Sequence, residues 1–152
     1  MSIDKEVEIL RQIPLFANID PAKLKLMAFA SERLTFQSGH SLFRQGDPGD
    51  AAYIIVEGTA DILVDTPSGP ITVATLAKND IVGEIAILCD VPRTATVTAM
   101  GELVTLKITK DLFFRMVTDF PEMGVEIMRV LAHRLEQTTA QLLKAGAAGA
   151  DS

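Results

Sequence analysis

The sequence predicts an α+β fold in which helices flank a central antiparallel β-structure. Three observations support this prediction. Apolar residues recur at helical spacing near both ends of the chain, apolar and polar side chains alternate in its middle, and turn residues divide that middle into short strands. The 152 residues, 48% of them apolar and 22% charged, are enough for one domain with a buried core.

The first 30 residues are predicted to form two helices. Ile3, Val7 and Leu10 recur at i, i+4 and i+7, which places them on one face of a short amphipathic helix. Asp20 followed by Pro21 is typical of an N-cap with proline at the first helical position, so we expect a second helix to begin there. Both helices precede the β-structure and belong to the same domain.

Residues 33–108 have the alternation and the turn signals of an antiparallel sandwich or barrel. The clearest alternation covers residues 94–100, where apolar and hydroxyl side chains take turns, and residues 104–108 repeat the pattern. One segment, residues 83–88, lacks alternation. We expect it to form one or two helical turns that interrupt the strands.

The last part of the chain returns to a helical pattern. A short helix over residues 110–117 precedes a longer one from Pro121 to about Lys144. We place the domain over residues 1–145 and expect residues 146–152, rich in Ala and Gly, to be a flexible tail. A heptad seam along the longer helix would either pair two copies of the chain or lie across the barrel. It consists of Met128, Leu131, Leu135, Thr138 and Leu142.

The charge balance and the cysteine count exclude several classes of protein. The chain has 14 Lys and Arg against 20 Asp and Glu, a net charge of −6, so its surface repels a nucleic-acid backbone. One cysteine, Cys89, is too few for a disulfide framework or a four-thiolate metal site. No apolar run approaches the about 18 residues of a membrane span, and the N-terminus is too charged for a signal peptide. We therefore expect a soluble, cytoplasmic protein.

Groups suited to catalysis are scarce. A metal enzyme on a barrel of this size needs several imidazole and carboxylate ligands, and the chain has two histidines, His40 and His133. Neither is expected to be a ligand, because the first lies in a turn region and the second on the last predicted helix. No Ser-His-Asp arrangement, Walker loop or paired-carboxylate spacing is present. We predict no enzyme activity, no catalytic residue, no cofactor and no metal site.

The interrupted segment contains the groups that an anionic ligand requires. Gly83 lets the backbone approach a ligand closely, and the amides of Ile85 and Ala86 at a helix start are unpaired donors. Arg93 follows Glu84 by nine residues and is predicted to lie on the apolar barrel wall, where an arginine needs an anionic partner. Two partners are equally open: Glu84 in an internal salt bridge, or a phosphate held jointly with the helix amides.

Residues 83–88 followed by residues 92–97 resemble the phosphate-binding cassette of the cyclic-nucleotide-binding domain family. The similarity covers about residues 10–143. Two departures remove no ligand group: Asn79 stands where glycine is common, and Val82 replaces a frequent aromatic residue. Asparagine tolerates the left-handed conformation. Positions outside the cassette that follow the family pattern are residues 13–16, Gly39, residues 43–47, Gly49, Asp50, residues 53–55, Gly58, Phe120 and Pro121.

The resemblance implies an antiparallel β-roll, a jelly-roll-like barrel, with N-terminal helices, C-terminal helices and a long final helix. It also implies roles for the cassette residues. Arg93 would neutralise the cyclic phosphate, because its planar fork matches two oxygens. The amides of Gly83, Ile85 and Ala86 would complete that cradle. Glu84 would accept the ribose 2′-hydroxyl.

Three threonines bear on the choice of base. In some family members a threonine at the position of Thr94 favours cyclic GMP, yet threonine also occurs there in binders of cyclic AMP. The alternative to a base contact, a threonine on a half-exposed face of a strand, is at least equally open. Residues 134–139 resemble the stretch of the catabolite activator whose hydroxyl residues meet the adenine amino group, which implies that contact for Thr138 and Thr139. The alternative for Thr138 is a hydroxyl bonded to its own helix. We favour cyclic AMP and keep cyclic GMP open.

These features predict a bacterial cyclic-nucleotide receptor that passes its signal to an unknown protein effector by movement of the last helix. A homodimer through that helix is one option. The catabolite-activator family places a helix-turn-helix after it, and none is found here, so we expect no DNA binding, and no membrane binding either. Two alternatives stay open: a regulatory domain of a larger kinase, channel or transcription factor, and a ligand-free interaction domain. The pair of Glu84 and Arg93 favours the receptor.

Overall fold

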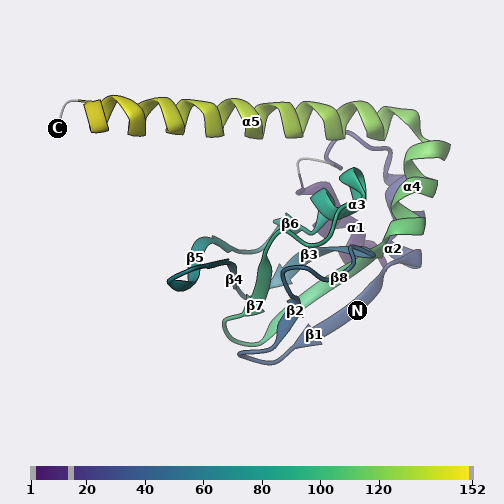
Figure 1. Ribbon diagram of the computed structural model, residues 1–152. Coiled ribbons are helices and arrows are strands. Elements are labelled where there is room, and N and C mark those ends of the chain that lie inside the picture. Colours follow the sequence, from purple (N-terminus) through teal and green to yellow (C-terminus); the bar gives the residue numbers. More distant parts are fainter. Residues whose placement is uncertain (1–2, 14–15, 151–152) are drawn as a thin grey trace.

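The computed structural model describes residues 3–13 and 16–150 and has the predicted α+β architecture, an antiparallel β-roll with helices at both ends (Figure 1). Residues 14–15 of the family pattern and residues 151–152 of the predicted tail lie outside the described residues. In chain order the elements are α1 (Ile3–Arg11), α2 (Pro21–Ala30), β1 (Glu32–Phe36), β2 (Ser41–Phe43), β3 (Ala51–Glu57), β4 (Ala60–Thr66), β5 (Gly69–Leu76), β6 (Ile81–Val82), α3 (Glu84–Cys89), β7 (Thr96–Ala99), β8 (Leu103–Thr109), α4 (Lys110–Asp119) and α5 (Pro121–Ala150).

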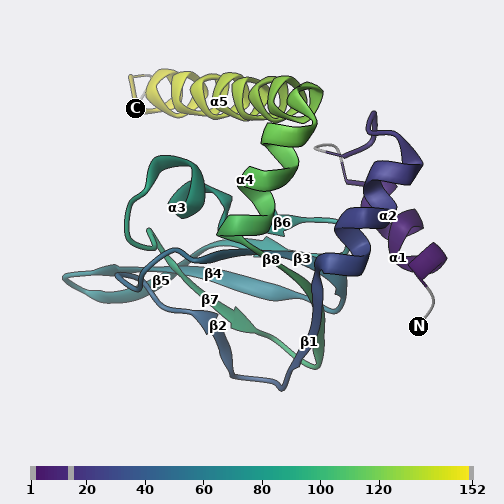
Figure 2. The same cartoon turned by 90° about the vertical axis from the view of Figure 1, so that its right-hand side faces the viewer.

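The strands form two four-stranded antiparallel sheets, in the orders β1-β8-β3-β6 and β2-β7-β4-β5. The core has two parts that meet on β3. Tyr53 and Ile55 lie in the apolar cluster inside the roll, whereas Ile54 and Val56 lie in the cluster beneath the helices. Successive side chains of a strand point to opposite faces, so β3 is buried on both of them. Figure 2 shows the helices on the outer side of this sheet.

Local capping signals define the helix starts. The carboxylate of Asp20 accepts a hydrogen bond from the amide of Ala22 at 2.8 Å, with Pro21 at the start of α2, so the predicted N-cap is confirmed. At the start of α4 the hydroxyl of Thr109 accepts a hydrogen bond from the amide of Leu112 at 3.2 Å. Both caps are local, which is why sequence spacing can predict a helix start of this kind.

The predicted strand over residues 94–100 is shorter in the structure, because β7 begins at Thr96. The preceding residues form a loop, and its backbone pairs with the turn that follows β2. The amide of Gly46 donates to the carbonyl of Arg93 at 2.9 Å, and the amide of Arg93 donates to the carbonyl of Asp47 at 2.8 Å. Residue 93 is therefore fixed by a turn that lies almost fifty residues earlier in the chain.

The final helix, α5, continues to Ala150 instead of ending near Lys144, in keeping with the high helix propensity of its alanines. The division of the chain at residue 145 stays a prediction. Figures 1 and 2 show α5 extended above the roll, with α3 between them. Met123 and Ile127 near its start are buried, and from residue 132 to residue 146 every described side chain is exposed. Within this one chain the outer part of the heptad seam is therefore uncovered.

No helix in the described part of the chain is both long enough and apolar enough to cross a membrane.

Candidate functional site

A cavity of about 640 Å³ lies between the start of α3 and the inner faces of β4, β5 and β7. Sites for small molecules typically measure about 300–1,000 Å³. Most of the wall is apolar, and Glu84, Arg93 and Asp80 supply its charged part. The predicted residues Gly83, Glu84, Ala86, Arg93 and Thr94 all line this cavity, together with the apolar side chains of Ile62, Val64, Val73, Leu76 and Val97.

Arg93 is the buried cation of the site, with 3% of its surface exposed. Its Nη1 donates a hydrogen bond to the carbonyl of Gly83 at 3.0 Å, and its Nη2 donates to the carbonyl of Ala51 at 2.5 Å. The guanidinium carbon lies 3.9 Å from the ring centroid of Phe43. Burial lowers the pKa of Arg93, and the charge of Asp50 opposes this shift. An arginine nevertheless stays protonated in proteins, so the cavity holds a fixed positive charge.

The third nitrogen of this guanidinium, Nε of Arg93, is buried and has no hydrogen-bond partner within the residues that the structure describes. An unsatisfied buried donor costs about 1–3 kcal/mol, and more on a charged group. An oxyanion that accepted a hydrogen bond there would remove this cost. The side chain thus has a donor to spare beside a cavity of ligand size.

The ion pair that the structure records for Arg93 is with Asp50, whose Oδ1 lies 3.7 Å from Nη2. The Asp50 side chain is 79% exposed, so water screens much of this attraction. Glu84, with 6% of its surface exposed, also contributes to keeping Arg93 charged. The sequence offered Glu84 or a phosphate as the partner, and it did not assign Asp50 or Phe43 to the site. Phe43 and Asp50 are both among the positions that follow the family pattern, and this pattern is the signal in the sequence that could have assigned them to the site.

Gly83 is required by its conformation and by its surroundings. Its φ of +93° lies in the left-handed region, and a Cβ there would lie 2.5 Å from Nη1 of Arg93 and 3.0 Å from the carbonyl oxygen of Ala51. In the structure this glycine makes its close approach to the arginine, and the predicted approach to a ligand stays a prediction. A second tight contact holds α3 in place, because a Cβ on Gly49 would lie 2.2 Å from the Cβ of Ala86.

The backbone at the start of α3 has donors to offer. Gly83 is the N-cap, and it has no side chain to accept from the first turn. Glu84, Ile85 and Ala86 form that turn, whose amides have no acceptor within the helix. Glu84 and Ala86 line the cavity, so the first turn borders it.

The three predicted base-contact threonines are placed differently. Thr94 is exposed and lines the cavity. Thr138 and Thr139 are exposed on the outer part of α5 and are not among the residues that line it. The structure brings the cassette residues together and leaves these two apart from them, since α5 extends above the roll (Figure 1).

A comparison with known families decides what kind of domain this is. The sequence profile of the cyclic nucleotide-binding domain matches residues 33–120, more than half of the chain. The chain belongs to the cyclic nucleotide-binding domain family. The resemblance of the cassette is thereby confirmed, and Gly83, Arg93 and Thr94 lie within the matched segment, whereas Thr138 and Thr139 lie beyond it.

Among the relatives of this cyclic nucleotide-binding domain are a transcriptional regulator and the regulatory parts of protein kinases. The CRP-like cAMP-activated global transcriptional regulator of Mycobacterium tuberculosis is 31% identical over 136 residues, covering 89% of this chain and 61% of that protein. A cAMP-dependent protein kinase regulatory subunit of Dictyostelium discoideum is 37% identical over 120 residues, 76% of this chain and 37% of that protein. The regulatory domain of Toxoplasma gondii PKA, co-crystallised with cAMP, is 26% identical with a TM-score of 0.77, covering 89% of this chain and 50% of that one. The chain spans less than two thirds of each.

Proposed function

We propose that this protein is a receptor without enzyme activity that binds a cyclic nucleotide in the cavity beside α3. The observation that carries the proposal is Arg93, a buried cation with an unpartnered Nε donor on the wall of a cavity of ligand size. A buried arginine beside apolar residues is stabilised by an anionic partner, and the recorded carboxylate of Asp50 is largely exposed to water. A cyclic phosphate supplies the missing charge.

The proposed contacts follow from the positions of the donors and acceptors. Arg93 would hold two phosphate oxygens, and the amides of Gly83, Ile85 and Ala86 would complete the cradle. The two bonds to backbone carbonyls use two of the five N–H groups of the guanidinium, so Nε and the second hydrogens of Nη1 and Nη2 remain as donors for a phosphate. Glu84, which is buried and lines the cavity, would accept the ribose 2′-hydroxyl. The apolar walls contributed by β4 and β5 would cover the base.

We propose cyclic AMP as the preferred ligand. The Mycobacterium tuberculosis relative is named as cAMP-activated, and the Toxoplasma gondii domain was crystallised with cAMP. Thr94 stands at the cavity wall, where it suits either base. Thr138 and Thr139 would reach the adenine only if their part of α5, from this copy or from a second one, moved over the cavity.

We also propose that ligand binding is signalled through α5. Asp50 connects Arg93 to the start of α4. Its carboxylate lies 3.7 Å from the guanidinium of Arg93, and its carbonyl accepts a hydrogen bond from the amide of Lys110, the first residue of α4, at 2.8 Å. The ammonium of Lys110 in turn donates to Asp90, at the end of α3, at 3.1 Å. A shift of the guanidinium toward a phosphate would change these contacts at the base of α4, which leads through Pro121 into α5. Ligand binding would then favour the helix arrangement that binds it better.

The exposed seam of α5 provides a surface on which this signal could leave the domain. Met128 is 63% exposed, and Leu135 and Leu142 are 68% exposed, although all three are large apolar side chains. Their heptad spacing fits a second copy of the same helix, and burial of this stripe in a homodimer or against a protein effector would stabilise the complex.

Calorimetric titration with cyclic AMP and cyclic GMP in parallel tests the proposal. We expect saturable binding of one nucleotide per chain and a higher affinity for cyclic AMP. Binding of neither nucleotide would leave the alternative of an interaction domain that kept the fold without the ligand. A higher affinity for cyclic GMP would keep the receptor and reverse the choice of base.

A further inference from the structure

Phe43, the last residue of β2, lies against the guanidinium of Arg93. The guanidinium carbon is 3.9 Å from the ring centroid, well within the about 6 Å over which a cation is attracted to an aromatic face. The Arg93 side chain is 2% exposed, so water does not screen this contact. Cation–π attraction is strongest in such desolvated places. Phe43 and Arg93 also line the same cavity.

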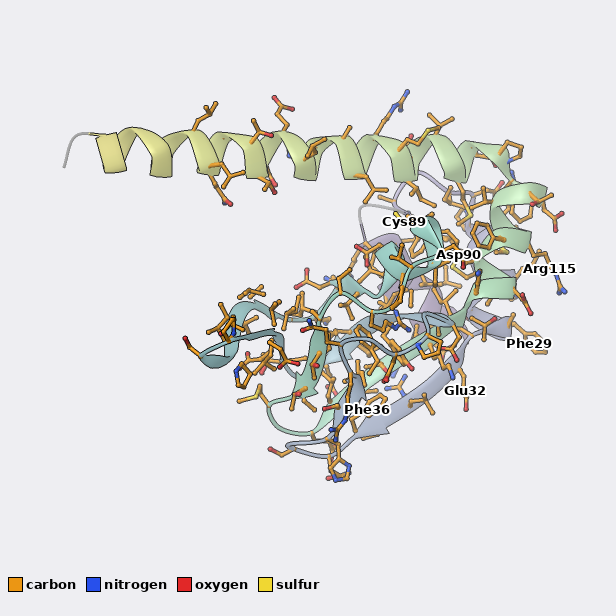
Figure 3. All side chains as sticks on the ribbon, in the orientation of Figure 1. Phe29, Glu32, Phe36, Cys89, Asp90 and Arg115 are labelled. Atoms are coloured by element: carbon orange, nitrogen blue, oxygen red, sulfur yellow. The ribbon has the colours of Figure 1, made fainter. Side chains whose placement is uncertain are left out.

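The ring of Phe43 is itself held in place. The backbone of Phe43 pairs with Val97 of β7 in the sheet. The ring of Tyr53 lies 6.1 Å away at an interplanar angle of 34°, and the ring of Phe36 meets Tyr53 edge-on, also at 6.1 Å. Figure 3 labels Phe36 on the lower side of the roll. Packed aromatic rings have few alternative positions, so the contacts among Phe36, Tyr53 and Phe43 fix the ring surface against which the guanidinium lies.

The hydrogen bonds and the ring constrain the guanidinium in different ways. The bonds from Nη1 to Gly83 and from Nη2 to Ala51 fix its direction within its own plane, while the ring of Phe43 supports one face of the group. A phosphate that binds Nε and a remaining Nη hydrogen would pull the group toward the cavity. Attraction to the aromatic face tolerates movement across that face, because it has no directional donor and acceptor to break. Phe43 can therefore support the cation before and after the ligand binds.

We propose that Phe43 is a positioning residue, which holds the guanidinium of Arg93 in the orientation that receives the cyclic phosphate. The inference rests on the proposed function, because it concerns the binding of the same ligand. It goes beyond it by assigning a role to a side chain that has no polar group and no proposed contact with the phosphate.

The test is a double-mutant cycle on cyclic AMP affinity, measured by displacement of a fluorescent cyclic AMP analogue. Phe43→Leu keeps an apolar side chain but removes the aromatic face, and we expect it to weaken binding about 5- to 30-fold. Phe43→Tyr keeps the face and should stay within about 2-fold. In an Arg93→Gln background, which lacks the cation, Phe43→Leu should change the affinity by less than about 2-fold. Thermal unfolding of each variant controls for folding, and Phe43→Met replaces Phe43→Leu if the leucine variant does not fold.

A second measurement does not need a ligand. In the ligand-free protein the NMR signal of the Arg93 Nε–H should carry a ring-current shift that Phe43→Leu removes and Phe43→Tyr retains. An equal loss of affinity from Phe43→Leu in the parent and in the Arg93→Gln background would overturn the proposal, since Phe43 would then be only part of the apolar wall. A parent that binds neither cyclic AMP nor cyclic GMP would instead refute the proposed function.

Discussion

Replacement of Arg93 by alanine is the sharpest test of the proposed site. Arg93 has 3% of its surface exposed and is the buried cation of the cavity, so Arg93→Ala would leave a bound phosphate without its charged partner. Loss of one partner of a buried, hydrogen-bonded charge pair costs about 2–5 kcal/mol. We therefore expect the affinity for cyclic AMP to fall about thirty- to several-thousand-fold. Arg93→Lys should recover part of the loss, because an ammonium supplies the charge but not the two-pronged fork.

The effect of Arg93→Ala on folding has opposing parts. The variant leaves the carbonyls of Gly83 and Ala51 without their present donors, at about 1–3 kcal/mol each where they stay dry. It also removes a buried charge and an unpartnered Nε, which offsets part of that cost. A thermal melt of each variant is therefore measured beside the binding.

The assay is calorimetric titration of cyclic AMP, repeated by displacement of a fluorescent analogue where the affinity is low. Arg44→Ala is a matched control, because it removes the same charge from an exposed position one residue beyond β2 and should leave the affinity within about 2-fold. If the folded Arg93→Ala variant binds cyclic AMP within a few-fold of the parent, the assignment of the phosphate site is wrong.

Three further predictions follow from the site and from α5. Gly83→Ala should lower the free energy of unfolding by about 1–3 kcal/mol and weaken binding, because backbone strain at φ +93° adds to a collision with the guanidinium. Chemical denaturation measures this loss, which should be smaller for the control Gly39→Ala, where φ is +85° but the space is open. Thr138→Ala with Thr139→Ala should weaken cyclic AMP more than cyclic GMP in the same titration; equal weakening would contradict the adenine contact. Hydrogen exchange with saturating cyclic AMP should protect α5 as well as the cassette, and unchanged exchange in α5 would describe a binder without a switch.

Local residue patterns predicted much of this molecule. The cap at Asp20, the alternation along the strands and the helical turn after Gly83 depend on neighbours within a few positions, and the structure confirms each of them. Asn79 has φ +75°, in the left-handed conformation that asparagine tolerates and that the departure from glycine required. The burial of Arg93 was also predicted, from the alternation of Ala95 and Val97 along an expected strand, but the structure buries this side chain from the loop that precedes β7.

Contacts between distant parts of the chain were decided only by the tertiary structure. Asp50 and Phe43 meet Arg93 because the end of β2 and the start of β3 converge on the loop before β7, which also shortens that strand. The course of α5 and the exposure of its seam depend on whether another surface covers them. Spacing along the sequence fixes which face of a helix or strand a side chain occupies, but not what packs against that face. This is why the sequence determined the cation of the site, and the folded chain determined the ring and the carboxylate beside it.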